Sequence, residues 1–208
     1  MARIATLEQL RQVLPEPRST TRMKILPELD DQAREFIETS PFLFLATVDE
    51  AGKVEVSPKG DERGFVKIED GRTLLIPERA GNNLAFGLQN ILATGSIGLI
   101  FVRPNTGETL RVSGKAEVFD DIDLLQQLGS EQRPALLAIR VHMQHCFFHC
   151  ARSFLRARLW EPASWDEKKR VSFGRVVAPK LGIDEAAVQK IDETVAEGYA
   201  SRLWTNRP

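Results

Sequence analysis

The strongest constraint on the fold is a series of short β-type segments between residues 42 and 119, each followed by a turn sequence. Residues 42–48 (FLFLATV) are rich in β-branched and aromatic residues, and residues 53–57 alternate polar residues with valine across an Asp-Glu-Ala-Gly turn, which predicts a hairpin. Two further strand pairs are predicted at 65–68 with 73–76 and at 97–102 with 109–119. Six antiparallel strands joined by tight turns favour a mainly β, α+β barrel over a doubly wound parallel sheet.

A further strand is predicted at residues 135–141, and helical spacing of apolar residues predicts peripheral helices in four places. A capping box at Thr6 and Gln9 opens the first of these helices, and the others fall near 29–37, near 84–92 across one barrel end, and from Asp184 onward. We therefore expect three parts: a helical appendage at 1–40, the barrel at 41–162, and a helical extension at 163–208 packed on the barrel or on a dimer partner.

The overall charge argues against several classes of partner. Lysine and arginine total 28 against 29 acidic residues, so neither a nucleic acid nor a membrane is expected as a partner. Residues 1–14 lack the apolar core of a signal peptide, and no stretch has the roughly 18 apolar residues of a membrane span. Two cysteines four residues apart are poorly placed for a disulfide, so we expect a soluble cytoplasmic protein with reduced thiols.

The segment LLIPERAGNN (74–83) predicts an anion site, because a buried strand enters a polar, glycine-containing turn that opens a helix. A helix N-terminus presents unpaired N–H groups, and Arg79 can hold a phosphate with two hydrogen bonds. The alternative is a charged loop in which Asn82 or Asn83 only caps the helix.

The segment VEVSPKGD (54–61) ends a predicted strand, which Pro58 interrupts. Lys59 could contact a phosphate, and the backbone groups of Ser57 and Gly60 could bind the edge of a planar heterocycle. The alternative is a solvated hairpin end.

The order and spacing of these segments resemble the FMN-binding split barrel of the pyridoxamine 5'-phosphate oxidase superfamily, over residues 41–120 and more loosely to 162. The SPKGD and ERAGNN blocks, with FLFLATVDEAGKVEV before them and IGLIFVRPNTGETLRVSGKAEV after them, are similar to a subgroup thought to be FMN-dependent enzymes of unknown substrate. The resemblance implies a six-stranded antiparallel split β-barrel with peripheral helices, bound FMN and a homodimer.

The same resemblance implies which residues bind the cofactor. Lys59 occupies the place of a phosphate contact at the end of the second strand, and the loop after the fourth strand offers Arg79, Asn82 and Asn83. Ile76 and Pro77 lie where backbone groups meet the ribityl chain or the ring, and Thr109 lies near a glutamine contact of the oxidases. The predicted cofactor-binding set is Ser57, Pro58, Lys59, Gly60, Ile76, Pro77, Arg79, Asn82, Asn83 and Thr109.

Two departures from the oxidases bear on function. The serine-arginine-lysine phosphate triplet is absent, and the chain ends Arg202-Leu203-Trp204 where the oxidases have an arginine-leucine-histidine signature that holds their vitamer substrate. We therefore expect flavin binding without that substrate.

All histidines and cysteines of the chain lie between residues 142 and 150. If this segment were a helix, His145 with His149 and Cys146 with Cys150 would each share a face and could bind a transition metal or haem. The alternative, and our expectation, is a structural or substrate-pocket role without metal. The basic run after it (Arg152, Arg156, Arg158) is expected to make dimer contacts, and Trp160 is expected to pack in the core.

The leading hypothesis is an oxidoreductase in which hydride passes between a small-molecule substrate and the flavin. No catalytic acid or base is identified, although His145 and His149 are candidates because the unperturbed pKa of a histidine side chain lies near neutrality. The alternatives are a non-catalytic flavin carrier, a haem-binding split barrel and a user of deazaflavin.

Overall fold

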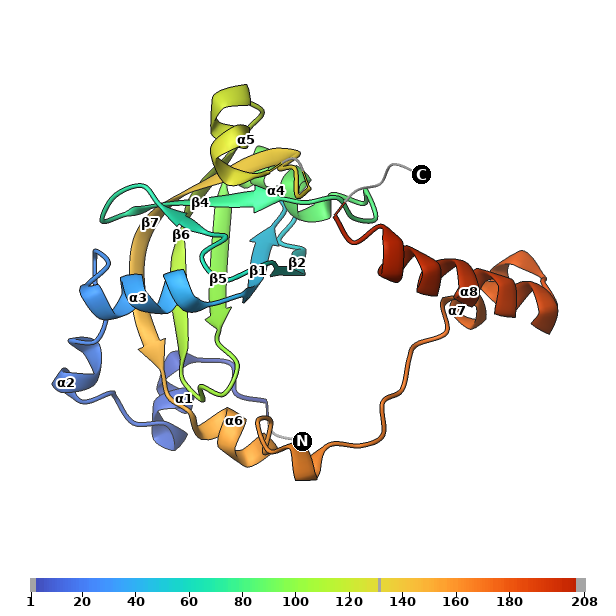
Figure 1. Ribbon diagram of the computed structural model, residues 1–208. Coiled ribbons are helices and arrows are strands. Elements are labelled where there is room, and N and C mark those ends of the chain that lie inside the picture. Colours follow the sequence, from blue (N-terminus) through green and yellow to red (C-terminus); the bar gives the residue numbers. More distant parts are fainter. Residues whose placement is uncertain (1–2, 131, 205–208) are drawn as a thin grey trace.

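The computed structural model describes residues 3–130 and 132–204, and it is an α+β protein built around one antiparallel sheet (Figure 1). Its strand order is β2-β1-β5-β6-β7-β4-β3, so β2 and β3 are the two edges. The strands are β1 (Phe42–Val48), β2 (Val54–Gly60), β3 (Lys67–Ile68), β4 (Thr73–Glu78), β5 (Ser96–Val102), β6 (Thr109–Phe119) and β7 (Leu137–His149).

The sheet differs from the predicted six-stranded barrel in two ways. Within the described residues it has seven strands, and its edge strands β2 and β3 do not pair, so the sheet is not closed. The seventh strand, β7, begins near the predicted position but continues to His149. A shift in the pairing of β6 with β7 at Ser113/Gly114 interrupts the regular alternation of β7, which is why the sequence pattern ended too early.

The core lies on the concave side of the sheet. Apolar side chains reach it because they alternate with more exposed side chains along the strands. In β1, Leu43 and Leu45 are fully buried, and their neighbours on the other face are exposed or partly exposed. Helix α3 (Asp31–Thr39) adds Ala33, Phe36 and Ile37 to the same core, and Asp30 caps its first turn. The predicted helix near 29–37 is thus present and packs on the sheet.

The remaining helices lie around the sheet (Figure 1). The predicted helix across one end is α4 (Phe86–Thr94), which contacts β1 and β2, and Thr6 caps the predicted N-terminal helix. The others are α1 (Leu7–Val13), α2 (Ser19–Arg22), α5 (Ile122–Leu128), α6 (Arg152–Ala157) and a short 3₁₀ turn at Pro162–Ser164.

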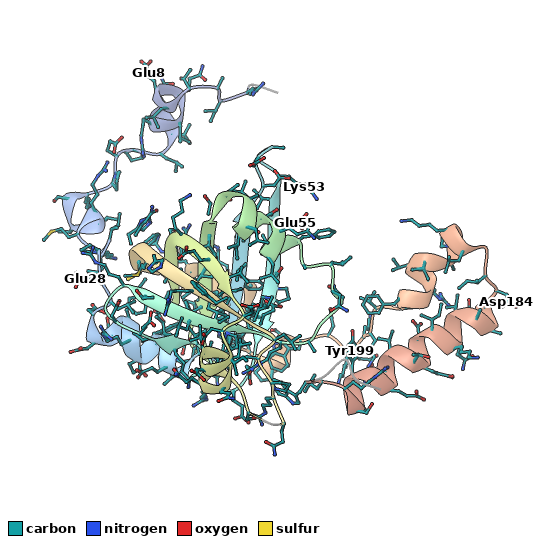
Figure 2. All side chains as sticks on the ribbon, turned by 90° about the horizontal axis from the view of Figure 1, so that it is seen from above. Glu8, Glu28, Lys53, Glu55, Asp184 and Tyr199 are labelled. Atoms are coloured by element: carbon teal, nitrogen blue, oxygen red, sulfur yellow. The ribbon has the colours of Figure 1, made fainter. Side chains whose placement is uncertain are left out.

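The C-terminal helices α7 (Phe173–Leu181) and α8 (Glu185–Ser201) pack on each other and stand away from the sheet (Figure 1). Gly174 allows the close approach, because a Cβ there would lie 2.4 Å from the backbone oxygen of Val188. Figure 2 places Asp184 at the outer tip of this pair and Tyr199 nearer the sheet. We call residues 165–204 the arm, since they leave the sheet near α6 and return near the end of β4.

In the part of the chain that the structure describes, no helix combines the length and the apolar character needed to cross a membrane.

Candidate functional site

The candidate site begins on the inner face of β2, where side chains alternate between partly buried and exposed positions. Ser57 and Lys59 point inward, and Leu45 and Leu43 of β1 are their register partners. Helix α4 lies over this strand: a Cβ on Gly87 would be 3.7 Å from Oγ of Ser57. The first turn of α4 and the inner face of β2 therefore meet at Ser57.

Two ion pairs join the end of β2 to the end of β4, across the side where the sheet is open. Lys59 pairs with Glu78, and each of these side chains is 19% exposed. Arg79 pairs with Asp61 at 2.8 Å, and the carboxylate of Asp61 is only 3% exposed. Because β2 and β4 are not hydrogen-bonded neighbours, these side chains hold the two ends together.

Arg79 also fixes the segment that enters β7. Its Nη1 donates to the backbone oxygen of Arg133 at 2.9 Å, and its Nη2 donates to that of Leu128 at 3.0 Å. With Nε bonded to Asp61, every nitrogen of the guanidinium has a protein partner. In this arrangement Arg79 organises the site from inside and is not an exposed cation.

Arg133 lies next to this cluster and connects it to the arm. It pairs with Glu62 at 2.5 Å, and its guanidinium lies 4.8 Å from the ring centroid of Trp204. The hydrogen bond from Arg133, together with its charge, lowers the pKa of the Glu62 carboxyl. Three cations at the site are thus matched by three carboxylates.

The loop between β4 and α4 contains two residues in left-handed conformations and a side-chain hydrogen bond to the backbone. Asn83 and Ala85 adopt left-handed conformations with φ of 60° and 53°, and Oδ1 of Asn82 accepts a hydrogen bond from the N–H of Leu84 at 3.0 Å. The residue that caps α4 is Ala85, and no side chain accepts a hydrogen bond from the first turn. The N-cap position is therefore Ala85 and not Asn82 or Asn83, and within residues 3–130 and 132–204 no side chain caps the N–H groups of that turn.

The remaining predicted residues fall into two groups. Pro58 and Gly60 are exposed on edge strand β2, whereas the side chains of Ile76 and Pro77 are buried in β4, so only the backbone of these two could meet a ligand. Thr109 is 6% exposed at the start of β6, where it pairs with His149. It is three strands from Gly60 in the sheet register, which corresponds to roughly 14 Å.

The histidine and cysteine segment lies on β7, so the helical premise of the metal hypothesis is wrong. On a strand, residues four apart are about 13 Å from each other, too far for His145 and His149 to bind one metal ion. No group of three or more potential metal ligands occurs among the described residues. Burial, reinforced by the nearby charge of Asp30, raises the pKa of the Cys146 thiol to about 11, which disfavours the thiolate that a metal would need.

Sequence reasoning quoted Asp61 and Glu78 within the two motifs but assigned them no role, and it missed Arg133 and Glu62. The available signal was complementary charge: Lys59 and Asp61 end one motif, Glu78 and Arg79 lie in the other, and the structure pairs Lys59 with Glu78 and Asp61 with Arg79. Trp160, expected in the core, is partly exposed and donates from its indole to the backbone oxygen of Thr106 at 2.8 Å.

The chain is thus an α+β protein with an open antiparallel sheet, in which Lys59 at the end of edge strand β2 lies against Glu78 at the start of the strand-to-helix loop. The sequence profile of the pyridoxamine 5'-phosphate oxidase family matches residues 29–150, which is more than half of the chain. The chain belongs to this family.

Several solved structures are similar to the chain at low identity. HupZ of Group A Streptococcus is 18% identical, with a TM-score of 0.47 over 58% of this chain and 93% of that one. An FMN-binding protein of Syntrophomonas wolfei is 12% identical, with a TM-score of 0.43 over 69% and 97%. The haem storage protein HutZ of Vibrio cholerae is 16% identical, with a TM-score of 0.43 over 57% and 93%. No curated protein matched the chain.

Proposed function

We propose that the chain binds FMN non-covalently and acts as an oxidoreductase on a small-molecule substrate. The observation that carries this proposal is that Lys59 and the hydroxyl of Ser57 share the inner face of β2, where the first turn of α4 meets it. No side chain of the described residues caps that turn. A cationic side chain, a hydroxyl and helix N–H groups form the donor set that a phosphate monoester requires. Membership of the family supports the choice of a flavin.

The cofactor-binding residues have distinct proposed roles. Lys59 and the loop that contains Asn82 and Asn83 hold the phosphate, while Arg79 fixes the loop ends through Asp61 and two backbone carbonyls. The backbone of Ile76 and Pro77 would face the ribityl chain or the ring, and Thr109 would contact the far end of the ligand. Bound flavin would supply the hydride chemistry, and the protein would supply binding and orientation.

Replacing Lys59 tests the cofactor proposal. We expect Lys59→Met to weaken FMN binding by about tenfold or more, because a charge-assisted hydrogen bond to the phosphate is lost. The dissociation constant is measured from the quenching of flavin fluorescence. Lys115→Met is the matched control, since Lys115 is exposed on β6 and its Nζ donates to the backbone oxygen of Thr94, at the opposite end of α4 from the proposed phosphate site; it should bind FMN normally.

The outcomes separate the proposed function from its alternatives. A protein that binds no flavin would overturn the FMN proposal, and a haem absorption band lost on replacing His145 or His149 would support the haem-binding alternative. Preference for a deazaflavin in direct competition would identify that cofactor instead. Tight FMN binding without turnover in a substrate screen would identify a flavin carrier.

We also propose a homodimer, in the cytoplasm, whose interface includes the outer face of β2, β1 and β5. That face exposes an apolar set formed by Phe44, Val54, Val56 and Ile100. Exposed apolar patches on strands that lie at or near a sheet edge are typical of association sites. The arm also exposes apolar side chains, among them Phe173 and Val176, and we propose that it packs on the partner.

Light scattering tests the dimer. The natural chain should have twice its 23.4 kDa monomer mass, and Val56→Glu should shift it to the monomer because the charge would be buried in the interface. Phe173→Glu tests the arm in the same way. Ile122→Glu, on the exposed face of α5, is the control and should remain dimeric. A monomeric natural protein that still binds flavin would rule out the dimer.

A further inference from the structure

The cation proposed to bind the phosphate already has an anionic partner. Lys59 is paired with Glu78, and both side chains are mostly buried at the junction of β2 and β4. A phosphate that reaches Nζ of Lys59 must either displace this carboxylate or lie beside it. In either position the negative charge of Glu78 weakens the binding of the phosphate.

The neighbouring carboxylates are held differently. Asp61 is bonded to Arg79, and Glu62 is bonded to Arg133. Glu78 is therefore the one carboxylate of this cluster whose partner is the lysine assigned to the ligand.

We propose that Glu78 is a specificity-determining residue, which competes with the phosphate of the ligand for Lys59 and so limits how strongly the site prefers FMN to riboflavin. This inference rests on the proposed function. It follows because the two flavins differ only in the phosphate, so an ion pair that the phosphate must break lowers the affinity for FMN and leaves that for riboflavin unchanged.

The test measures the dissociation constants of FMN and of riboflavin for the full-length protein. Glu78→Gln keeps the size and polarity of the side chain and removes its charge. FMN should bind about fivefold more tightly to this variant, the factor expected from an ion pair near a protein surface, and riboflavin should bind as before. A double-mutant cycle is completed by measuring Lys59→Met alone and Lys59→Met combined with Glu78→Gln. Between these two proteins, FMN affinity should differ by less than about twofold.

Glu69→Gln is the matched control. Glu69 pairs with Arg140 at 2.6 Å and lies beside Thr73, at the end of β4 opposite to Glu78. Its removal should leave the ratio of FMN to riboflavin affinity unchanged. Far-ultraviolet circular dichroism before titration establishes that each variant is folded.

Three results would overturn the inference. If Glu78→Gln leaves FMN affinity unchanged while the natural protein binds FMN, this inference alone is wrong. If the gain is the same in the Lys59→Met background, Glu78 acts by direct repulsion of the phosphate and does not compete for Lys59. If the natural protein binds neither flavin, the proposed function and this inference both fail.

Discussion

A chain carrying Gly114→Ala is expected to lose about 3 kcal/mol or more of its free energy of unfolding. Gly114 lies at the shift in register between β6 and β7, and a Cβ there would be 2.2 Å from the backbone oxygen of His142. It would also be 3.1 Å from Cα of Met143. These are backbone atoms of the neighbouring strand, so no rotation of a side chain can relieve the contact.

Gly98→Ala is the matched control for this prediction. Gly98 lies on β5 of the same sheet, and a Cβ there would have no atom of the described residues of its own chain within 4 Å. Its replacement should change stability by less than about 0.5 kcal/mol, or raise it slightly, because alanine reduces the conformational freedom of the unfolded chain. Urea denaturation followed by circular dichroism measures both variants. A Gly114→Ala protein as stable as the Gly98→Ala protein would show that the two strands can separate at the bulge without cost.

The strands between residues 42 and 119 could be predicted because their information is local. Alternating polarity and turn residues set each hairpin, and the predicted range 109–119 matches β6. The range 97–102 differs from β5 by one residue. The second half of β7 could not be predicted, since its pairing partner is distant in sequence and the bulge at Gly114 breaks the alternation.

The candidate site could be predicted only in part, because its contacts join residues that are distant in the sequence. The SPKGD and ERAGNN motifs marked two strand ends, and the structure does bring these ends together. Which cation meets which carboxylate depends on contacts across the open side of the sheet, and no local pattern encodes them. The role of Arg79 as a phosphate ligand stays a prediction, and its hydrogen bonds to Asp61 and to two backbone carbonyls could not be read from the motif.

The second large effect is a loss of folding stability, which we expect from Arg79→Met because the substitution removes those hydrogen bonds. The substitution leaves the carboxylate of Asp61, 3% exposed, without its cation. It also removes the hydrogen bonds to the carbonyls of Leu128 and Arg133, of which the Arg133 carbonyl keeps a bond from the N–H of Ser130 at 3.1 Å. Removing one partner of a buried ion pair costs about 3–5 kcal/mol, because a charge stays buried without compensation. Urea denaturation of the protein without flavin measures this loss independently of any cofactor.

Two further variants identify the cause of that loss. In the double variant Asp61→Asn with Arg79→Met, no charge is left buried, so part of the lost stability should return. Arg175→Met removes an arginine whose ion pair with Glu185 is exposed on both sides, and it should cost less than about 1 kcal/mol. If Arg79→Met were no more harmful than Arg175→Met, the Asp61 to Arg79 pair would not hold the end of β2 to the end of β4. If the double variant were no more stable than Arg79→Met, the loss would come from the lost hydrogen bonds to the carbonyls of Leu128 and Arg133 and not from the buried charge of Asp61.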